Sequence, residues 1–527
     1  MPYKNLSEFI AVLEKQNELH RIKEFISPKL EISEISDRVV KSGGKALLFE
    51  NTGTDFPLLI NAFGSEKRMC LALGIENLDE IKGRIDALFK NALTSGKSLT
   101  EKLHKLSLLR EISSWMPKTI SGKGKCQEKI MPSPDITKLP VLTCWPHDGG
   151  PFITLPVVHT QDPVSGMRNV GMYRMQVFSA CKTAMHWHLH KNSARHFHEY
   201  KKLKKKMPVS VTLGGDPIYT YVATAPLPDN MDEYLLAGFL RKKRVKLVKC
   251  LTNELYVPED VDFVIEGYID PEEELITEGP FGDHTGFYSL PEPFPVFHIT
   301  CITHRKDAIY PATIVGIPPM EDAWLGKATE RIFTSPIKYA LQPEIIDIHM
   351  PVEGVFHNLV LVKIKNIYQG IAQKIINGLW GAGQMMFSKI IIVLDENADI
   401  FNYPEVVKAI SENVNISSDI IFSKGPADIL DHSAKNYAFQ GKIGIDATVK
   451  KDSSLITPSI NKENLSKIFD EIVKLNDTLL HQNINAVIIS YKKSKPNHTR
   501  ILAEKLITEN ILLNIQSCFF LDFNVEV

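Results

Sequence analysis

The spacing of apolar residues gives the first part of the chain a mixed pattern of helices and short strands. The positions that mark one face of the first predicted helix are Leu6, Phe9, Ile10 and Leu13. Two apolar runs, ALLFENTG at 46–53 and PLLINAFG at 57–64, are typical of strands. We therefore expect an N-terminal α/β domain over residues 1–115.

From about residue 141 to 310, short apolar runs are separated by turn residues. The predicted strands are FITLPVVHT, NVGMYRMQVF, VSVTLG, YTYVATAP, VKLVKC, DFVIEGYI and FPVFHITCITH. Only the stretches 193–205 and 231–243 interrupt them with helical spacing. Many strands with few helices predict a barrel or a sandwich. The Lys-, Gly- and Pro-rich passage 116–140 before them is predicted to be a linker.

After about residue 335 the pattern is again that of an α/β domain. A helical stretch at 366–387 precedes the apolar run KIIIVLDENAD, and the helix PEVVKAISENV follows. This order is typical of a βα crossover in a parallel sheet. A helix, the strand NAVIISY, another helix and the strand CFFLDFNVEV complete the chain. The expected domains after the first are 116–335, which includes the linker, and 336–450, with an extension at 451–527.

Composition limits the class of protein. The 527 residues are 44% apolar, which is enough for several sizeable cores and indicates a soluble globular protein. The 61 basic and 62 acidic residues nearly cancel, so no overall field attracts nucleic acid or an anionic membrane. The basic runs at 201–206 and 241–244 lack flanking aromatic residues, and we interpret them as solvated faces.

Cysteine usage and the N-terminal sequence favour a cytoplasmic location. The seven cysteines are scattered without a CxxC pair, which is typical of reduced thiols. The N-terminal sequence MPYKNLSEFIAVLEKQ has charged residues among its apolar ones and lacks the core of a signal peptide. No apolar run approaches the ~18 residues that a membrane-spanning helix needs.

Two polar patterns in the β-rich middle carry candidate chemistry. On a strand, HWHLH at 186–190 would place its three histidines on one face, where they could line a polar cavity or bind metal, or simply be satisfied surface groups. In NVGMYR at 169–174, Asn169 and Arg174 lie at opposite ends of an otherwise apolar strand. Arginine offers a planar fork for a carboxylate or a phosphate, although a structural ion pair is the commoner role.

A third pattern, TEGPFGDHTGFY at 277–288, places two acids around a turn. Turn chemistry explains its glycines but not why Glu278 and Asp283 flank them. Two acids near an arginine in a desolvated cleft would acquire different pKa values, one ionised and one kept protonated. A further acid, Glu233, stands where a helix is predicted to start, a position that by itself favours acids.

Six segments together resemble the UbiD family of prenylated-FMN-dependent decarboxylases over roughly residues 1–450. They are NVGMYRMQV, HWHLHK, PVSVTLGGDP, PLPDNMDEYLLAGFLR, EGPFGDHTGFY and GKIGIDAT. The finer pattern is most similar to the menaquinone-biosynthesis branch of the futalosine pathway. The polyprenyl-hydroxybenzoate branch usually has Arg-Trp-Leu where this chain has His186, Trp187 and His188.

The resemblance implies a fold and an activity. The fold is a multidomain α/β architecture with an N-terminal mixed α/β domain, a central split β-barrel that binds flavin, and a C-terminal α/β oligomerisation domain. The activity is reversible, non-oxidative decarboxylation of a hydroxylated aromatic acid, with 1,4-dihydroxy-6-naphthoate expected for menaquinone and 4-hydroxy-3-polyprenylbenzoate as the alternative. A non-catalytic flavin-binding protein and a flavin reductase are rival hypotheses. The resemblance also implies a homo-oligomer, dimer or hexamer, a cofactor supplied by a flavin prenyltransferase of the UbiX type, and at most peripheral membrane contact.

The resemblance also assigns roles to residues. The ligands of a divalent metal, normally Mn²⁺ or else Mg²⁺, are Asn169, His190 and Glu233, with Lys191 as an alternative to His190; K⁺ is a further candidate ion. The residues expected to bind prenylated FMN are Met172, Tyr173, Arg174, His186, Trp187, His188, Lys191 and Lys442. The expected catalytic network is Arg174, Glu278 and Asp283, in which Asp283 returns a proton to carbon while the other two hold cofactor and substrate carboxylate.

Overall fold

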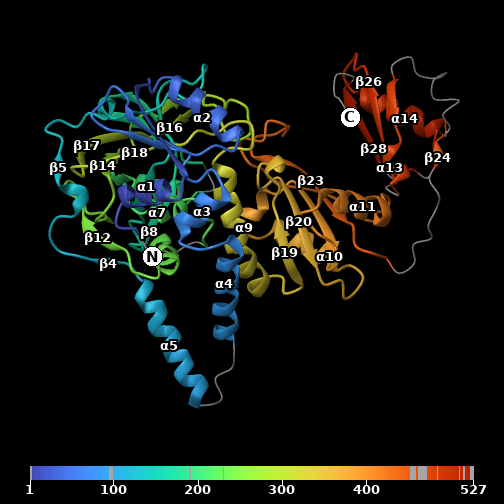
Figure 1. The fold of residues 1–527 in the computed structure, drawn as a ribbon, viewed down its shortest axis with the longest axis horizontal. Coiled ribbons are helices and arrows are strands. Elements are labelled where there is room, and N and C mark those ends of the chain that lie inside the picture. Colours follow the sequence, from blue (N-terminus) through green and yellow to red (C-terminus); the bar gives the residue numbers. More distant parts are fainter. Residues whose placement is uncertain are drawn as a thin grey trace. The chain divides into compact units, whose positions relative to one another are not determined.

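The structure is a computed structural model. It describes residues 3–93, 99–188, 191–228, 231–450, 459–460, 472–482, 485–509, 511–513, 515 and 517–522. The described residues divide into two compact units, one within 1–336 together with Leu430–His432 and the other within 337–429 and 433–527 (Figure 1). Among the described residues, no helix combines the length and apolar character needed to cross a membrane.

The first unit begins with the predicted α/β arrangement. Helix α1 (Leu6–Lys15) starts at Asn5, whose side chain accepts a hydrogen bond from the Glu8 N–H, and all four apolar positions predicted to mark one face of the helix are buried. Four strands form one sheet in the order β1-β2-β3-β18. Their bounds are β1 Leu19–Phe25, β2 Ala46–Asn51, β3 Leu58–Ile60 and β18 Tyr310–Pro311. The accompanying helices are α2 Glu31–Lys41, α3 Glu66–Leu73, α4 Leu78–Leu93 and α5 Leu99–Trp115.

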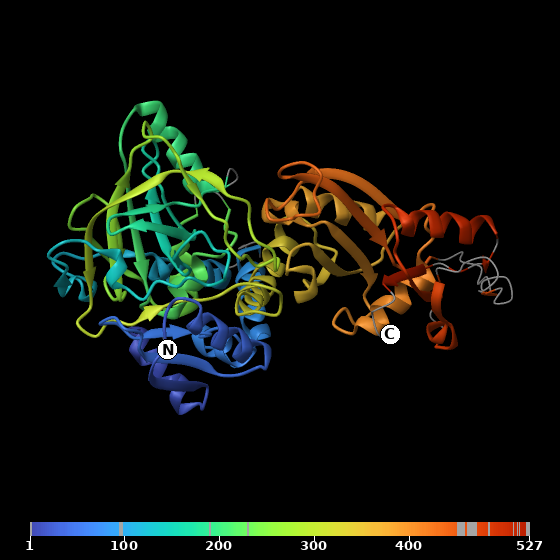
Figure 2. The same ribbon diagram turned by 90° about the horizontal axis from the view of Figure 1, so that it is seen from above.

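A nine-stranded sheet makes up the middle of the first unit (Figure 2). Eight strands follow the order β6-β9-β10-β17-β14-β11-β7-β8, and β5 pairs with β17. Their bounds are β5 Lys129–Ile130, β6 Phe152–Ile153, β7 Val157–Gln161, β8 Arg168–Met172, β9 Met175–Ser179, β10 Lys182–Ala184, β11 Met207–Leu213, β14 Phe263–Ile269 and β17 Val296–His304. Only Tyr173 and Arg174 join β8, at one end of this order, to β9, next to the other end. The sheet must therefore curl until its ends approach each other, which confirms the expected split barrel.

Helices and smaller strands complete the barrel region. Helices α6 (Asn192–Leu203) and α8 (Glu233–Arg241) lie where helical spacing is predicted. The smaller strands are β4 Lys118–Thr119, β12 Lys246–Lys249, β13 Tyr256–Pro258, β15 Ile276–Glu278 and β16 Glu292–Phe294. Helix α9 (Asp322–Ala340) follows the barrel in sequence.

Two sequence-based expectations for this region are wrong. The run YTYVATAP is not a strand, because its first half belongs to helix α7 (Pro217–Val222). Asp216 caps the Ile218 N–H, and Pro217 occupies the first turn. All six residues of α7 are buried, so no polar face reveals the helical period. The stretch 116–140 is not a free linker, since β4 pairs with β12 and β5 with β17.

The second unit contains the predicted crossover. Its main sheet has the order β19-β20-β21-β23-β22, in which β20, β21 and β23 run parallel. Alternate residues of β20 and β21 enter separate cores, one shared with α10 and the other with α11. The bounds are β19 Ile345–His349, β20 Leu359–Ile364, α10 Ile371–Trp380, β21 Ile390–Asp395, α11 Tyr403–Asn413, β22 Ile420–Pro426 and β23 Phe439–Asp446.

The end of the chain adds a smaller α/β arrangement. Strand β26 pairs with β25 and, in parallel, with β28, and β24 pairs with β27. The bounds are β24 Ser459–Ile460, β25 Ile472–Asn476, α13 Thr478–His481, β26 Ala486–Tyr491, α14 His498–Thr508, β27 Leu512–Leu513 and β28 Ser517–Asp522. The strands predicted in NAVIISY and CFFLDFNVEV are thus confirmed within the described residues.

Candidate active site

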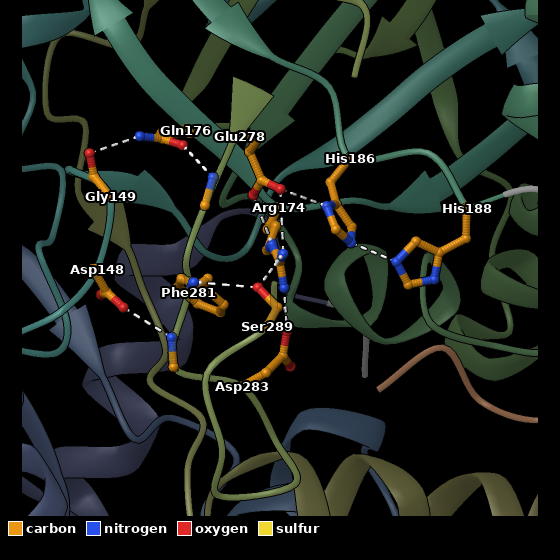
Figure 3. Close-up of polar contacts among 12 residues, drawn as sticks. Asp148, Gly149, Arg174, Gln176, His186, His188, Glu278, Phe281, Asp283 and Ser289 are labelled. Atoms are coloured by element: carbon orange, nitrogen blue, oxygen red, sulfur yellow. Dashed lines mark hydrogen bonds and ion pairs between the residues drawn. The ribbon is translucent and has the colours of Figure 1, made fainter. Parts of the chain in front are cut away.

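Of the two acids of TEGPFGDHTGFY, Glu278 ends β15 and Asp283 lies in the loop that joins β15 to β16. Asp148 fixes the middle of this loop. One carboxylate oxygen of Asp148 accepts from the Gly282 N–H at 2.8 Å (Figure 3). The other accepts from the backbone N–H groups of Cys144 and Trp145 at 3.0 and 2.8 Å. At Gly282, a Cβ atom would lie 2.2 Å from the Trp145 ring, so only glycine allows this approach.

Gln176 of β9 fixes the beginning of the same loop. Its side-chain oxygen accepts from the Gly279 N–H at 2.7 Å, and its side-chain nitrogen donates to the Gly149 carbonyl at 2.8 Å (Figure 3). Gly279 has φ +97°, a conformation that disfavours other residues. The loop is therefore tied by two buried or half-buried side chains from distant segments.

Arg174 lies between the two acids. Its Nε donates to Glu278 Oε1 at 2.9 Å and its Nη2 to Glu278 Oε2 at 3.2 Å, while Nη1 is paired with Asp283 Oδ2. Nη2 also donates to Ser289 Oγ at 3.0 Å, and the guanidinium carbon lies 4.7 Å from the centroid of the Phe281 ring. The Arg174 side chain is only 9% exposed. Because it has so many fixed partners, the guanidinium group has a single orientation. Its positive charge lies in a site that is almost closed to water.

Two histidines extend this network (Figure 3). His186 Nδ1 lies 2.8 Å from Glu278 Oε2, and His186 Nε2 is hydrogen-bonded to His188 Nε2. The strand considered for HWHLH is not formed in its described part, because β10 ends at Ala184 and residues 185–188 belong to no strand. The side chains of His186 and His188 nevertheless meet, in a segment that belongs to no strand. His190 lies outside the described residues.

The pKa values of Glu278 and Asp283 both lie below their ordinary range, which favours the ionised form of each acid. Burial opposes ionisation of Glu278, but the hydrogen bond from His186 and the charge of Arg174 outweigh it and lower the pKa to about 2. Burial of Asp283 is likewise outweighed, by Arg174 and then by His284, so its pKa lies well below the ordinary value. The expectation that one acid stays protonated is therefore wrong here, because a single guanidinium contacts both carboxylates.

The Glu233 carboxylate lies against the backbone of β8 at Val170, the residue after Asn169. The Val170 N–H of β8 donates to Glu233 Oε2 at 2.9 Å, and Asn169 Nδ2 donates to Ser193 Oγ at 3.0 Å. That hydrogen bond fixes the orientation of the Asn169 amide group, in which Oδ1 is the hydrogen-bond acceptor. Glu233, at the start of α8, is 6% exposed and forms no ion pair within 4.0 Å in the described part of the chain. Burial raises the pKa of Glu233 to about 8. Buried amide and carboxylate oxygens suit a hard divalent cation.

Tyr173 and Trp187 form an apolar wall beside these groups. The two rings are edge to face with centroids 6.4 Å apart, and both residues are buried. The Trp187 indole N–H has no hydrogen-bond partner among the described residues, although it is buried. A buried donor without an acceptor is costly, so it fits a site that receives a polar ligand.

The two lysines expected at the cofactor lie in different units. Lys191 directly precedes α6, and its backbone N–H donates to the His188 carbonyl at 3.0 Å. Lys442 belongs to β23 in the second unit, where its ammonium donates to the Ser388 carbonyl at 2.9 Å and also to that of Met386. Met172 ends β8 directly before Tyr173. The roles of these residues stay predictions.

Three site residues carry no local pattern in the sequence. Asp148, Gln176 and Ser289 hold the loop or Arg174, and each does so across a turn or a long separation along the chain. Gln176 is a polar residue within an apolar run, which is only a weak indication that it holds another segment. Its role can be recognised only once the loop is known to lie beside β9.

Comparison with known proteins gives matches along most of the chain. The family models described as the N-terminal, Rift-related and C-terminal domains of 3-octaprenyl-4-hydroxybenzoate carboxy-lyase, known as UbiD, match residues 10–88, 118–318 and 323–447. The boundaries expected from the sequence stay predictions.

Relatives and solved structures agree with these matches. An uncharacterized protein of Archaeoglobus fulgidus is 49% identical over 453 residues, which are 85% of this chain and 92% of that protein. One of Aquifex aeolicus is 48% identical over 452 residues, with the same coverage of each chain. The vanillic acid decarboxylase of Sedimentibacter hydroxybenzoicus in closed form has a TM-score of 0.75 at 26% identity, covering 89% of this chain and 98% of that one. HmfF of Pelotomaculum thermopropionicum, described as a UbiD-class enzyme in complex with FMN, has a TM-score of 0.72 at 24% identity, covering 88% and 99%.

Proposed function

Because the chain belongs to the UbiD family of carboxy-lyases, we propose that it removes CO₂ from a hydroxylated aromatic acid without net oxidation, with 1,4-dihydroxy-6-naphthoate of menaquinone synthesis as its substrate. The observation that carries the proposal is the buried Arg174, held between Glu278 and Asp283. A fixed guanidinium can bind a carboxylate substrate, and a neighbouring acid can supply the proton that replaces CO₂.

We propose prenylated FMN as the cofactor, with a divalent metal, Mn²⁺ or Mg²⁺, at its phosphate. An evolved dimeric form of HmfF is described in complex with prenylated FMN, and the chain offers groups of the right chemistry. Asn169 and Glu233 would contribute oxygen ligands to the metal, and the Trp187 N–H and the Tyr173 ring would contact the flavin. The bound cofactor would supply the electron sink that no side chain provides when the carbon–carbon bond breaks.

The residues of the network would divide the remaining work. Arg174 would bind the substrate carboxylate while Glu278 holds the guanidinium in its orientation through two hydrogen bonds. Asp283 would donate a proton to the ring carbon after CO₂ leaves. A bound substrate carboxylate would raise the pKa of Asp283, because a second negative charge beside it disfavours ionisation.

The proposed ring system rests on the sequence around the site. His186 and His188 stand where the polyprenyl-hydroxybenzoate branch usually has Arg and Leu, and His186 contacts Glu278 directly. The alternative substrate, 4-hydroxy-3-polyprenylbenzoate, has a single ring with one hydroxyl group and a long apolar chain, in place of a dihydroxylated double ring. We further propose that a UbiX-type flavin prenyltransferase supplies the cofactor and that the second unit mediates homo-oligomerisation, which light scattering of the purified protein would test.

The test is a comparison of both acids with cofactor-loaded enzyme. Protein co-expressed with a flavin prenyltransferase should carry prenylated FMN by mass spectrometry and release CO₂ from 1,4-dihydroxy-6-naphthoate. Faster turnover of the polyprenylbenzoate would contradict the proposed substrate. Oxidation of NAD(P)H without CO₂ release would instead support a flavin reductase.

A further inference from the structure

Every turnover of a decarboxylase of this type consumes one proton, and Asp283 is too enclosed to collect it directly. Its side chain is 10% exposed, and both oxygens are engaged. Oδ2 is paired with Arg174 Nη1. Oδ1 accepts from the His284 backbone N–H at 2.7 Å and from His284 Nδ1 at 2.9 Å.

These described contacts differ in whether they can deliver a proton. The Arg174 guanidinium keeps its protons at any pH at which the protein is folded. A backbone amide is not an acid in this range. The imidazole of His284 is the remaining contact, and imidazole gains and loses protons near neutral pH.

The other end of the network does not lead to Asp283. His186 contacts Glu278, but the described hydrogen bonds of Glu278 continue only to Arg174, which does not transfer a proton onward. A proton that reached Glu278 through the His186 and His188 pair would therefore stop there. The two ends of the network thus have separate roles.

We propose that His284 relays a proton from solvent to Asp283 in each turnover. The inference rests on the proposed function, because it takes Asp283 as the acid that protonates the ring carbon. The His284 side chain is 17% exposed, so it spans the step from the buried carboxylate toward water.

The proton is accounted for at each step. Uptake of a proton at His284 Nε2 gives an imidazolium ion. Its Nδ1–H bond then breaks as an Oδ1–H bond forms on Asp283, which leaves a neutral ring and a neutral acid. The acid O–H bond breaks as the C–H bond of the product forms, and the Asp283 carboxylate is regenerated. The ring returns to the Nδ1–H form by releasing the Nε2 proton to water and taking up a proton from water at Nδ1.

The surroundings of His284 favour this cycle. Within the first unit, the carboxyl groups of Asp283 and Asp322 face it, with Arg174 behind Asp283 and Glu321 behind Asp322. Negative charge on either carboxyl group stabilises the imidazolium ion. Burial raises the pKa of Asp322 to about 7, so this group also exchanges protons near neutral pH.

Two substitutions separate a relay from a merely structural hydrogen bond. His284→Asn keeps a side-chain N–H near the position of Nδ1 but cannot pass a proton, whereas His284→Ala leaves room for added imidazole. We expect kcat to fall about 10²-fold in both variant holoenzymes. Added imidazole should then raise the kcat of His284→Ala about tenfold and leave that of His284→Asn unchanged. The exposed His147, which lies against Tyr288, provides the control His147→Asn with an unchanged rate.

Each outcome is decisive when cofactor content, measured by absorbance, is equal in all variants. A His284→Asn enzyme that works at the wild-type rate beside an impaired His284→Ala enzyme would show a structural role and overturn the relay. So would an impaired His284→Ala enzyme that imidazole does not rescue. If the wild-type holoenzyme releases CO₂ and both variants are equally active, the relay is overturned but the proposed function is not. If the wild-type holoenzyme releases no CO₂, the proposed function is overturned as well.

Discussion

His186 and Arg174 share one oxygen of Glu278. His186 Nδ1 lies 2.8 Å from Glu278 Oε2, and Arg174 Nη2 donates to the same atom at 3.2 Å. Since an ionised carboxylate only accepts, His186 carries its proton on Nδ1. Burial and the charge of Arg174 lower the pKa of His186, so the ring is neutral and its Nε2 accepts from His188. The tautomers of both rings follow from the charge of Glu278.

Replacing His186 tests this arrangement. The hydrogen bond from His186 is the largest of the influences that lower the pKa of Glu278. In His186→Leu we expect that pKa to rise by about one unit. The acidic limb of the kcat–pH profile should move to higher pH, because Glu278 holds Arg174 only when ionised. An acidic limb that stays in place would contradict this role for His186.

The depressed pKa of Glu278 also predicts how stability depends on pH. The folded value is about 2, against an ordinary 4.5, so the stabilisation is present above pH 4.5 and is lost as pH falls toward 2. The shift corresponds to about 3 kcal/mol. In Glu278→Gln, the free energy of unfolding should fall less steeply over this window than in the wild-type protein. Equal slopes in urea titrations between pH 4.5 and 3 would contradict the assigned ion pair.

Asp148 should be important for stability although it takes no part in the proposed chemistry. Asp148→Ala leaves the N–H groups of Cys144, Trp145 and Gly282 without their acceptor, at a cost of about 2–4 kcal/mol in total. Asp148→Asn keeps one acceptor oxygen and should cost less. Urea unfolding measures both. An alanine variant as stable as the wild-type protein would mean that these hydrogen bonds are readily replaced by water.

The proposed metal site predicts a loss that does not depend on catalysis. Glu233→Gln removes the anionic oxygen ligand with little change in size, so metal content after purification should fall at least about tenfold. Asp232→Asn is the matched control, because asparagine caps a helix as well as aspartate and the residue is adjacent to Glu233. Elemental analysis gives the result. Equal manganese content in Glu233→Gln and wild type would exclude Glu233 as a ligand.

The sequence predicted those features that depend on local spacing or on whole motifs. The buried face of α1, the start of α8 at Glu233 and the crossover around β21 all follow from periodicity and capping. The resemblance to the UbiD family, which the family models confirm, named Arg174, Glu278 and Asp283 together, and the structure brings these three side chains into contact.

Other features depend on contacts that no local pattern encodes. Asp148 lies 134 residues from Gly282, and Gln176 lies 103 residues from Gly279, so their hydrogen bonds exist only in the folded chain. The lowered pKa values of both acids are not predictable either, because the sequence does not show that one arginine contacts both Glu278 and Asp283. Helix α7 was missed because its complete burial removes the polar face on which periodicity depends.

The central claim is that Asp283 protonates the carbon from which CO₂ leaves, in a site organised by Arg174. The most direct measurement compares CO₂ release from 1,4-dihydroxy-6-naphthoate by wild-type protein and by Asp283→Asn, both loaded with prenylated FMN. We predict release by the wild-type protein and a loss of at least about 10²-fold in the variant, with cofactor content unchanged. Undiminished CO₂ release by Asp283→Asn would contradict the account.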